Sequence, residues 1–242
     1  MKVAVITDAH ANLPALQAAL NAIKAHGVDA IYHTGDAVGI GPFPAETLDL
    51  LLNTPNMRFV MGDYDAYFVD GLPDAAPEGM TAEAFEHQQW TNAMLDPALR
   101  ETLAAWPYVL ELELEDVPVA FVHYGLAGDG RTFAPIIEEP TAEDLDKLFA
   151  RHETTLAVFY GHAPKKSSLQ GRAMYINPGS LGCQTSATAN YCIFDVRRGN
   201  LVIDHHQVVY DDSSLYDAFE KRAVPGRVPF YQAFFGGRFG GR

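Results

Sequence analysis

The sequence predicts an α/β protein: a four-layer α/β/β/α sandwich of two mixed sheets with helices on both outer faces. Short apolar runs typical of buried strands alternate with amphipathic helical patterns early in the chain, and hairpin patterns follow later. The chain has 242 residues, of which 48% are hydrophobic, so it can bury one sizeable core. Because no linker rich in Pro, Gly or Ser divides it, we expect a single domain over residues 1–242.

The first part of the chain alternates strands and helices. After the first apolar run, apolar residues recur at helical spacing, and Gly27 can end that helix. Successive strands joined by helices are expected to be parallel. The expected elements are a strand at 3–6, a helix at 13–23, a strand at 30–33, a helix at 44–52 and a strand at 58–61.

A different pattern covers residues 66–107. Helical segments rich in aromatic residues and methionine replace the strands there, which predicts a small helical cap inserted beside the sheets. Trp90, Tyr67 and Phe68 are candidates to stack on a ring of a substrate, and equally to pack in a core.

Strands return after the cap. Residues 109–114 alternate with period two and residues 117–122 are almost continuously apolar, so a half-exposed strand pairs with a buried one in a hairpin. The Gly- and Arg-rich end, residues 232–242, is expected to be a flexible tail. The other expected elements are a helix at 141–152 and strands at 156–160, 174–176, 191–196 and 201–203, the last two joined by residues 197–200.

Composition excludes several classes of protein. The formal net charge of −14 argues against nucleic acid as a partner, because proteins that bind it neutralise phosphates with Lys and Arg. No stretch approaches the roughly 20 apolar residues of a membrane span, and the start does not resemble a signal peptide, so we expect a cytoplasmic protein. Cys183 and Cys192 lack the number and spacing of a disulfide framework or a zinc knuckle. Nothing in the sequence indicates the oligomeric state.

Residues of metal-ligand type follow several of the apolar runs. Strands of an open α/β sheet bring their carboxyl ends to a common crevice, so these side chains can converge although they are far apart in sequence. The expected product is a cluster of carboxylates and imidazoles that binds metal. The motifs are Asp8-Ala9-His10, Gly35-Asp36, Gly62-Asp63-Tyr64-Asp65, Val122-His123 and Gly161-His162.

In this order the motifs resemble those of the calcineurin-like metallophosphoesterases, more closely their small bacterial branch. Two further segments, Gly39-Ile40-Gly41-Pro42 and Asn177-Pro178-Gly179-Ser180, also look like that branch. The resemblance implies hydrolysis of a phosphate monoester or diester of a small molecule, by a water that two divalent metal ions activate. Manganese, iron and zinc all suit mixed oxygen and imidazole ligands.

The resemblance also implies how the ligands divide between the two metals. Asp36 bridges them, and the remaining ligands are Asp8 and His10 for the first metal and Asp63, His123 and His162 for the second. Two positions depart from the family pattern. Asp63 stands where the family has Asn, and Pro164 stands where the family has a last His in Gly-His-x-His. The first site is therefore expected to be the weaker one.

Three more residues match positions near the family's catalytic centre. Tyr64 stands where a His often protonates the leaving group, and since Tyr is a poor acid at neutral pH, we expect it to contact substrate or to pack. Asp65 is expected to orient a metal ligand, and Asn12 to contact phosphate or to brace the first loop. The alternative to an enzyme is a binding or scaffold protein on the same fold with one metal or none, which Pro164 favours.

Overall fold

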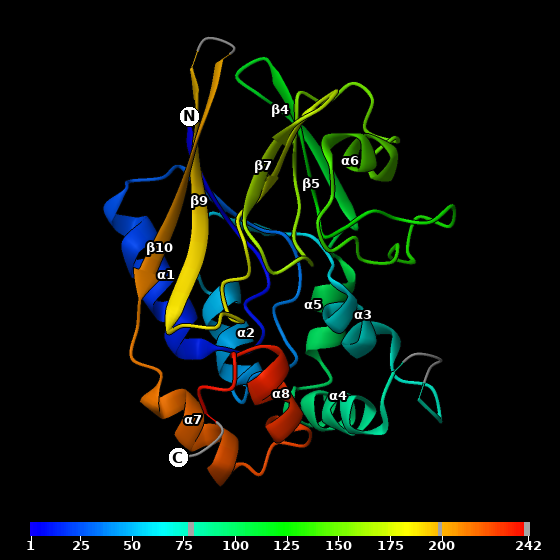
Figure 1. Cartoon of the computed structure of the whole chain (residues 1–242), viewed down its shortest axis with the longest axis vertical. Coiled ribbons are helices and arrows are strands. Elements are labelled where there is room, and N and C mark those ends of the chain that lie inside the picture. Colours follow the sequence, from blue (N-terminus) through cyan, green and yellow to red (C-terminus); the bar gives the residue numbers. More distant parts are fainter. Residues whose placement is uncertain (77–79, 198–199, 240–242) are drawn as a thin grey trace.

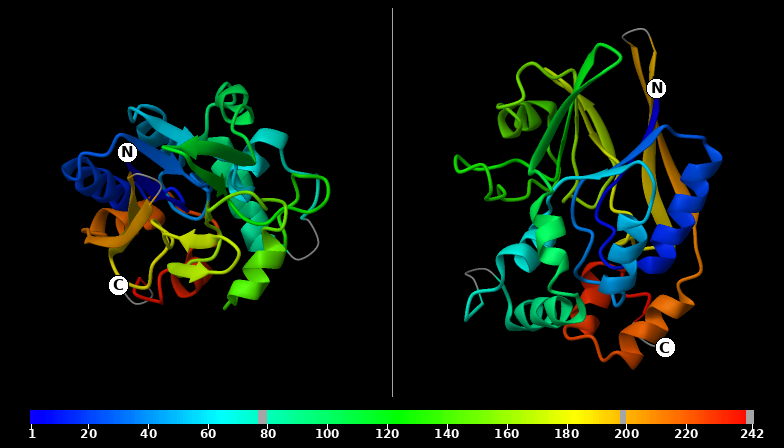
Figure 2. Two further views of the ribbon diagram at one scale, coloured as in Figure 1. Left: turned by 90° about the horizontal axis from the view of Figure 1, so that it is seen from above. Right: turned by 180° about the vertical axis from the view of Figure 1, so that it is seen from behind.

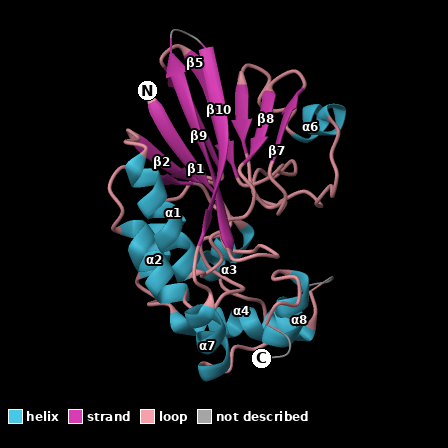
Figure 3. Cartoon of the chain, turned by 60° about the vertical axis from the view of Figure 1, so that its left-hand side comes forward, coloured by secondary structure: helices cyan, strands magenta, loops and turns pink. Residues whose placement is uncertain are grey.

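The computed structural model describes residues 1–76, 80–197 and 200–239. The strands of these residues form two five-stranded sheets that face each other (Figure 1). Helices lie on the outer side of each sheet (Figure 3). The four-layer α/β/β/α architecture predicted from the sequence is confirmed.

The first sheet has a parallel core with an antiparallel hairpin at one edge. Strand β1 pairs in parallel with β2, and β2 with β3, as the sequence predicts, while β9 runs antiparallel to β1. The hairpin of β9 and β10 is longer than expected, and residues 198 and 199 of its predicted connection lie outside the described residues. The order is β10 (Asn200–Val209), β9 (Thr188–Arg197), β1 (Lys2–Ile6), β2 (Ala30–His33) and β3 (Met57–Phe59).

The second sheet is also mixed. The predicted hairpin of β4 and β5 forms one edge, and β5, β6 and β8 are parallel. Strand β7 at the other edge was not expected from the sequence, because only Leu169 of its four residues is strongly apolar. The order is β4 (Val109–Leu114), β5 (Val117–Val122), β6 (Ala157–Phe159), β8 (Met174–Asn177) and β7 (Ser167–Gln170).

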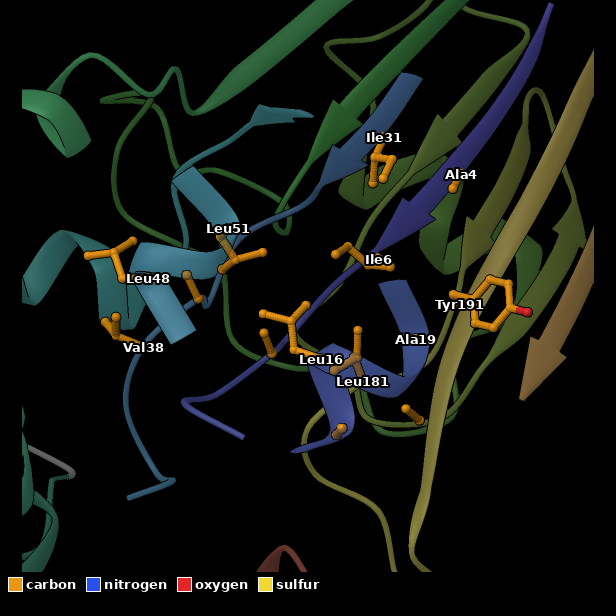
Figure 4. Close-up of a cluster of buried hydrophobic side chains, with 14 of the residues drawn as sticks. Ala4, Ile6, Leu16, Ala19, Ile31, Val38, Leu48, Leu51, Leu181 and Tyr191 are labelled. Carbon is orange, nitrogen blue, oxygen red and sulfur yellow. The ribbon is translucent and has the colours of Figure 1, made fainter. Parts of the chain in front are cut away.

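An apolar cluster fills each of the three spaces between the four layers. Helices α1 (Leu13–Ala25) and α2 (Pro44–Leu52) place Leu16 and Leu51 against Ile6 of β1 (Figure 4). Between the sheets, aromatic side chains such as Phe121 and Phe194 fill the interior. On the far side, α6 (Ala142–Leu148) packs on the second sheet. These clusters bury the apolar faces that the strand and helix periodicities predict.

The predicted cap contains α3 (Asp63–Asp70), α4 (Ala82–Met94) and α5 (Leu99–Ala104). It is joined by two helices near the C-terminus that the sequence analysis did not predict, α7 (Ser213–Lys221) and α8 (Arg227–Ala233). Figure 2, seen from behind, shows α4, α7 and α8 gathered at the end of the molecule away from the hairpin tips. The His87 ring on α4 lies 4.7 Å from that of Phe230 on α8. The cap is therefore built from two distant parts of the chain.

The expected flexible tail is packed as far as residue 239. Phe235 and Phe239 are buried, and the Arg238 guanidinium lies 3.4 Å from a carboxylate oxygen of Asp212 and stacks over Phe239. The expectation was wrong for residues 232–239 because buried aromatic area outweighs the freedom of the neighbouring glycines. Residues 240–242 lie outside the described part.

No helix within residues 1–76, 80–197 and 200–239 combines the length and the apolar character needed to cross a membrane.

Candidate metal centre

The predicted ligands follow the ends of five strands and meet at one place. Asp8 and His10 follow β1, Asp36 follows β2, and Asp63 begins the helix after β3. The second sheet contributes His123 after β5 and His162 after β6. All six lie in two groups of ligand atoms, each within 4.8 Å of one another: Asp36, Asp63, His123 and His162, and Asp8, His10 and Asp36.

The backbone at these ligands is unusual. Asp8, His10, Asp36 and His162 all have positive φ, at 53°, 44°, 59° and 64°. For residues other than glycine this left-handed conformation costs roughly 1 kcal/mol or more each. Strain of this kind persists only where the surrounding structure fixes it, and it is concentrated at functional sites.

Glycine precedes Asp63 and His162 because no side chain fits there. A Cβ on Gly62 would lie 2.2 Å from the backbone nitrogen of Asp36, and a Cβ on Gly161 would lie 1.9 Å from Oγ1 of Thr7. The Gly-Asp and Gly-His motifs therefore allow loops from both sheets to approach closely.

The four atoms of the second ligand group point to a common centre. Nε2 of His123 lies 3.0 Å from Oδ1 of Asp63, 3.1 Å from Nδ1 of His162 and 3.4 Å from Oδ2 of Asp36. Ligands about 2.1 Å from an octahedral ion are separated by about 3.0 Å, so this spacing fits one cation. Nδ1 of His123 lies 2.8 Å from the carbonyl oxygen of Thr34, which leaves Nε2 with its lone pair free for the metal.

The first ligand group is looser. Nε2 of His10 lies 3.7 Å from Oδ2 of Asp36 and 3.9 Å from Oδ1 of Asp8. Nδ1 of His10 faces the carbonyl oxygen of Val38 at 3.3 Å, so here too Nε2 is the nitrogen available for a metal. Asp36 is shared with the second group, as a bridging ligand must be.

An unpaired buried atom tests whether these residues fit a metal. Oδ2 of Asp8 is buried and has no hydrogen-bond partner among the described residues. A buried carboxylate oxygen without a partner is costly, whereas a cation would satisfy it. The donor set of oxygen and imidazole nitrogen also suits divalent transition metals. The residues therefore fit the divalent ions that the resemblance implies.

Burial and neighbouring charges shift the pKa values of the side chains in the centre. Burial raises the pKa of Asp8 and of Asp36, which also feels the charge of Asp63. Burial acts to raise the pKa of Asp63 as well, but hydrogen bonds from His123 and His162 hold it well below its usual value. Burial lowers the pKa of His10.

The two imidazoles of the second group have the opposite shift. Burial acts to lower the pKa of His123, but Asp36 and Asp63 raise it well above its usual value. The hydrogen bond with Asp63 likewise outweighs burial and raises the pKa of His162. Without metal, the neighbouring carboxylates therefore stabilise the protonated form of both imidazoles.

Asp65 contacts the metal loop through the backbone. Its buried carboxylate accepts hydrogen bonds from the backbone N–H groups of Asp36 at 2.9 Å, Ala37 at 3.0 Å, Val38 at 3.4 Å and Gly62 at 3.2 Å. It thus orients Asp36 by fixing the loop rather than by contacting a ligand side chain. Burial and the charge of Asp36 raise the pKa of Asp65 to about 7.

Both polar side-chain atoms of Asn12 already form hydrogen bonds within the protein. Its Nδ2 donates to the carbonyl oxygen of Gly182 at 2.7 Å and to the hydroxyl of Tyr210 at 2.9 Å. Its Oδ1 accepts from the backbone N–H of Ala15 at 3.2 Å and so caps α1. Of the two roles expected for Asn12, the contacts match bracing of the first loop.

Tyr64 packs against the first ligand group. Its ring meets the His10 ring edge-on at 5.2 Å, and a Cβ on Gly39 would lie 2.2 Å from the tyrosine ring. Burial, followed by the charges of Asp63 and Asp36, raises the pKa of its phenol far above neutrality. The phenol is therefore poorly suited to donate a proton to a leaving group.

Two clefts flank the ligand groups and share His162 and Ile136. The first cleft, of about 660 Å³, is lined by Asp8, His10, Pro164 and residues of the C-terminal segment. The second, of about 690 Å³, is lined by Asp63, Tyr67, Arg131 and other residues. Of the three aromatic candidates in the cap, only Tyr67 lines either cleft; Phe68 is buried, and Trp90 packs against the apolar cluster beneath α8.

The sequence analysis missed several residues of the first cleft. Lys166, Asn190, Gln207 and Phe234 line it beside Asp8 and His10. Their only sequence signal is the neighbouring motif Asn177-Pro178-Gly179-Ser180, whose Ser180 hydroxyl donates to the backbone carbonyl of Asp8 at 3.2 Å.

Several known proteins are similar to this chain in sequence or in fold. An uncharacterised protein of Methanocaldococcus jannaschii, MJ0912, is 29% identical, with 92% of this chain and 93% of that protein covered. The hypothetical protein PH1004 of Pyrococcus horikoshii OT3 has the same fold, with a TM-score of 0.81 at 19% identity over 97% of both chains. A metallophosphoesterase of Sphaerobacter thermophilus has a TM-score of 0.68 at 25% identity and covers 93% of this chain and 95% of its own.

The family match extends over most of the chain. The calcineurin-like phosphoesterase superfamily domain matches residues 1–199, which include every residue of both ligand groups. The match ends before α7 and α8, the two helices near the C-terminus. The ordered ligands at the strand ends and this match agree, and the chain belongs to the calcineurin-like phosphoesterase superfamily.

Proposed function

We propose that the protein is a metal-dependent phosphoric ester hydrolase that acts on a small phosphorylated molecule. One observation carries the proposal: two groups of ligand atoms, most of them on buried residues, share Asp36. A shared carboxylate is what a pair of neighbouring cations requires, and paired cations are a common device for phosphate ester hydrolysis.

The chain would bind the cations through the six predicted ligands. Asp8, His10 and Asp36 would bind the first, and Asp36, Asp63, His123 and His162 the second. Once bound, two divalent ions would lower the pKa of a water and neutralise charge on the phosphoryl group. Manganese is the metal we expect to support activity.

The side chains of the centre would position rather than protonate the substrate. The high pKa of Tyr64 leaves its phenol protonated at neutral pH, where it can contact the substrate. The clefts on both sides of the ligand groups leave room for a substituent on each side of the phosphorus. A phosphodiester is therefore the substrate class we expect, ahead of a monoester.

Hydrolysis of an aryl phosphate and of its bis-aryl diester tests the proposal. Metal-stripped protein reloaded with manganese would be compared with the Asp36→Asn variant, which keeps the shape of the shared ligand but removes its charge. We expect manganese-dependent turnover that falls at least about 100-fold in the variant. Asp49→Asn, an exposed carboxylate on α2, is the matched control and should retain wild-type turnover.

The alternative is a binding or scaffold protein that retains the fold and holds one metal or none. The observation that favours it is the absence of a ligand atom at Pro164, beside Asp8 and His10. Absence of turnover with either ester, together with binding of a single manganese ion, would support this alternative and contradict the hydrolase.

A further inference from the structure

The first cleft contains polar side chains that belong to neither ligand group. Asn190 on β9 and Gln207 on β10 are a cross-strand pair, and both line the cleft with Lys166, Asp8 and His10. In Figure 1 the lower ends of β9 and β10 approach the C-terminal helices. Phe234, the residue after α8, also lines the cleft. The cleft therefore joins the metal ligands to a part of the chain beyond the family match.

Asn190 has an unused hydrogen-bond donor. The residue is 3% exposed, and its Oδ1 accepts a hydrogen bond from Nε2 of Gln207 at 3.0 Å. Within the described part of the chain, its Nδ2 donates to no acceptor. Because Asn190 lines the cleft, this donor is available to an acceptor on a ligand.

Lys166 has an unused positive charge. Its ammonium forms no ion pair with any residue that the structure describes, whereas the ammonium of its neighbour Lys165 lies 2.9 Å from a carboxylate oxygen of Glu139. The two lysines line the same cleft, but only Lys166 offers a charge that is not already neutralised.

The Asn190 amide and the base of the Lys166 side chain both pack against Gly179. A Cβ on Gly179 would lie 2.8 Å from Nδ2 of Asn190 and 3.0 Å from Cβ of Lys166. Ser180, the next residue, donates its hydroxyl to the backbone carbonyl of Asp8. The Asn190 amide and the base of the Lys166 side chain therefore lie next to the loop that contacts the first ligand group, and the lysine stem can carry its ammonium into the cleft.

We propose that the first cleft binds a second anionic group of the substrate, such as a further phosphate or a carboxylate, through Lys166 and Asn190. This inference rests on the proposed phosphoesterase function and names the substrate class: an ester whose group beyond the reacting phosphate carries a negative charge. A protein of net charge −14 repels anions over most of its surface, so a local cation beside the metals would make the preference selective.

A matched pair of substrates tests the preference. Both would be 4-nitrophenyl phosphodiesters, one with a second ester arm that ends in a phosphonate and one with an arm of equal length that ends in a methyl group. We expect kcat/KM of the manganese-loaded protein to be about tenfold higher for the charged arm, with the difference in KM. The preference should shrink as ionic strength rises.

Variants separate the two donors from the rest of the cleft. Lys166→Ala should reduce the preference to about twofold or less, and Asn190→Asp should reverse it, because a carboxylate replaces the amide donor while the acceptor for Gln207 remains. Lys165→Ala is the matched control and should keep most of the preference. Equal turnover of the two substrates by the wild type, or an equal loss with Lys165→Ala and Lys166→Ala, would overturn the proposal.

Binding without turnover distinguishes this inference from the proposed function. Calorimetric titration of the manganese-loaded protein would compare an alkylphosphonate with the same compound carrying a second, terminal phosphonate. Tighter binding of the doubly charged compound that Lys166→Ala abolishes would support the cleft even if no ester is hydrolysed. Equal affinity of wild type and Lys166→Ala for that compound would overturn the inference even if esters are hydrolysed.

Discussion

The two ligand groups differ in how many ligands they have and in which sheets supply them. The first takes Asp8, His10 and Asp36 from the first sheet alone and opens to a cleft. The second adds His123 and His162 from the second sheet to two carboxylates, and the other three ligand atoms lie 3.0 to 3.4 Å from Nε2 of His123. A cation in the second group would bind the two sheets together, whereas one in the first would be exchangeable. Under the proposed function, one shared carboxylate would serve two sites of unequal strength.

Removing one imidazole from each group gives the largest expected contrast. His123→Ala should abolish tight binding of a cation and lower turnover roughly 1000-fold, because it removes the central ligand of the second group. His10→Ala should lower turnover but leave one tightly bound ion. Metal content after dialysis and kcat with manganese are the measurements. Loss of tight binding in His10→Ala, with retention in His123→Ala, would reverse the ranking of the two groups.

The pH dependence of metal binding should also differ between the groups. The pKa values of His123 and His162 are raised, so a metal must displace their protons, and affinity falls by up to about tenfold per pH unit for each proton as pH decreases. Burial lowers the pKa of His10, so this imidazole has no proton to lose near neutral pH, and only the carboxyl groups of Asp8 and Asp36, whose pKa values are raised, could release protons from the first group. The first group should therefore lose less affinity. Over two pH units near neutrality we expect a change of up to roughly 100-fold for each proton that the metal displaces from the second group.

Calorimetry in buffers of different ionisation enthalpy measures these protons directly. The tighter binding event should release more protons than the weaker one when the pH is somewhat below neutral. Asp63 should contribute none, since its pKa is held low and it is ionised throughout. Proton release confined to the weaker event would contradict the assignment of the imidazoles.

The carboxylate of Asp65, which accepts a hydrogen bond from the backbone of the shared ligand Asp36, should stabilise the folded protein. In Asp65→Asn, an amide NH₂ would face backbone N–H groups that now donate to a carboxylate, at Asp36 and its neighbours. We expect the free energy of unfolding of the metal-free protein to fall by about 2 kcal/mol. Urea unfolding measures it. Asp129→Asn changes a carboxylate that accepts similar hydrogen bonds on the surface and should cost less, so equal losses would argue against the special position of Asp65.

The convergence of the proposed ligands could be predicted from sequence because their signal is local. Each follows an apolar strand, and a glycine precedes Asp36, Asp63 and His162 where the loops approach closely. The role of Asp65 depends on which loop lies over the start of α3, so the sequence indicated a positioning role but not the backbone contacts. The alternation of strands and helices also predicts neighbouring parallel strands, whose carboxyl ends lie at the same edge of a sheet.

The walls of the first cleft could not be predicted in the same way. Asn190 and Lys166 meet at Gly179 only through the packing of β9 against the loop after β8, and no spacing in the sequence marks that contact. Phe234 lies in a segment whose glycines suggested a flexible tail, although Phe235 and Phe239 bury it against α7. Burial of aromatic area is a property of the tertiary structure rather than of the segment.

A ligand introduced at residue 164 would test why the two ligand groups are expected to differ in metal affinity. Pro164 lines the cleft beside Asp8 and His10, where the family pattern has a last His. Pro164→His should raise the affinity of the weaker site about tenfold and leave the tighter site unchanged. Pro164→Ala, which removes the ring without adding a ligand, is the control. Titration with manganese measures both sites, and two equal sites in the wild type would contradict the premise.

The smallest effect is expected for the hydroxyl of Tyr64. Tyr64→Phe keeps the ring that packs against His10 and Gly39 and removes only the phenol oxygen. Because burial and the charges of Asp63 and Asp36 raise its pKa far above neutrality, the phenol transfers no proton at neutral pH, and kcat should change less than about threefold. A general acid at this position would instead contribute about 100-fold and shape the alkaline limb of the pH–rate profile. If Tyr64→Phe abolished the fall in rate at alkaline pH, Tyr64 would be a catalytic residue. Proton transfer would then take place beside the first ligand group, against which Tyr64 packs.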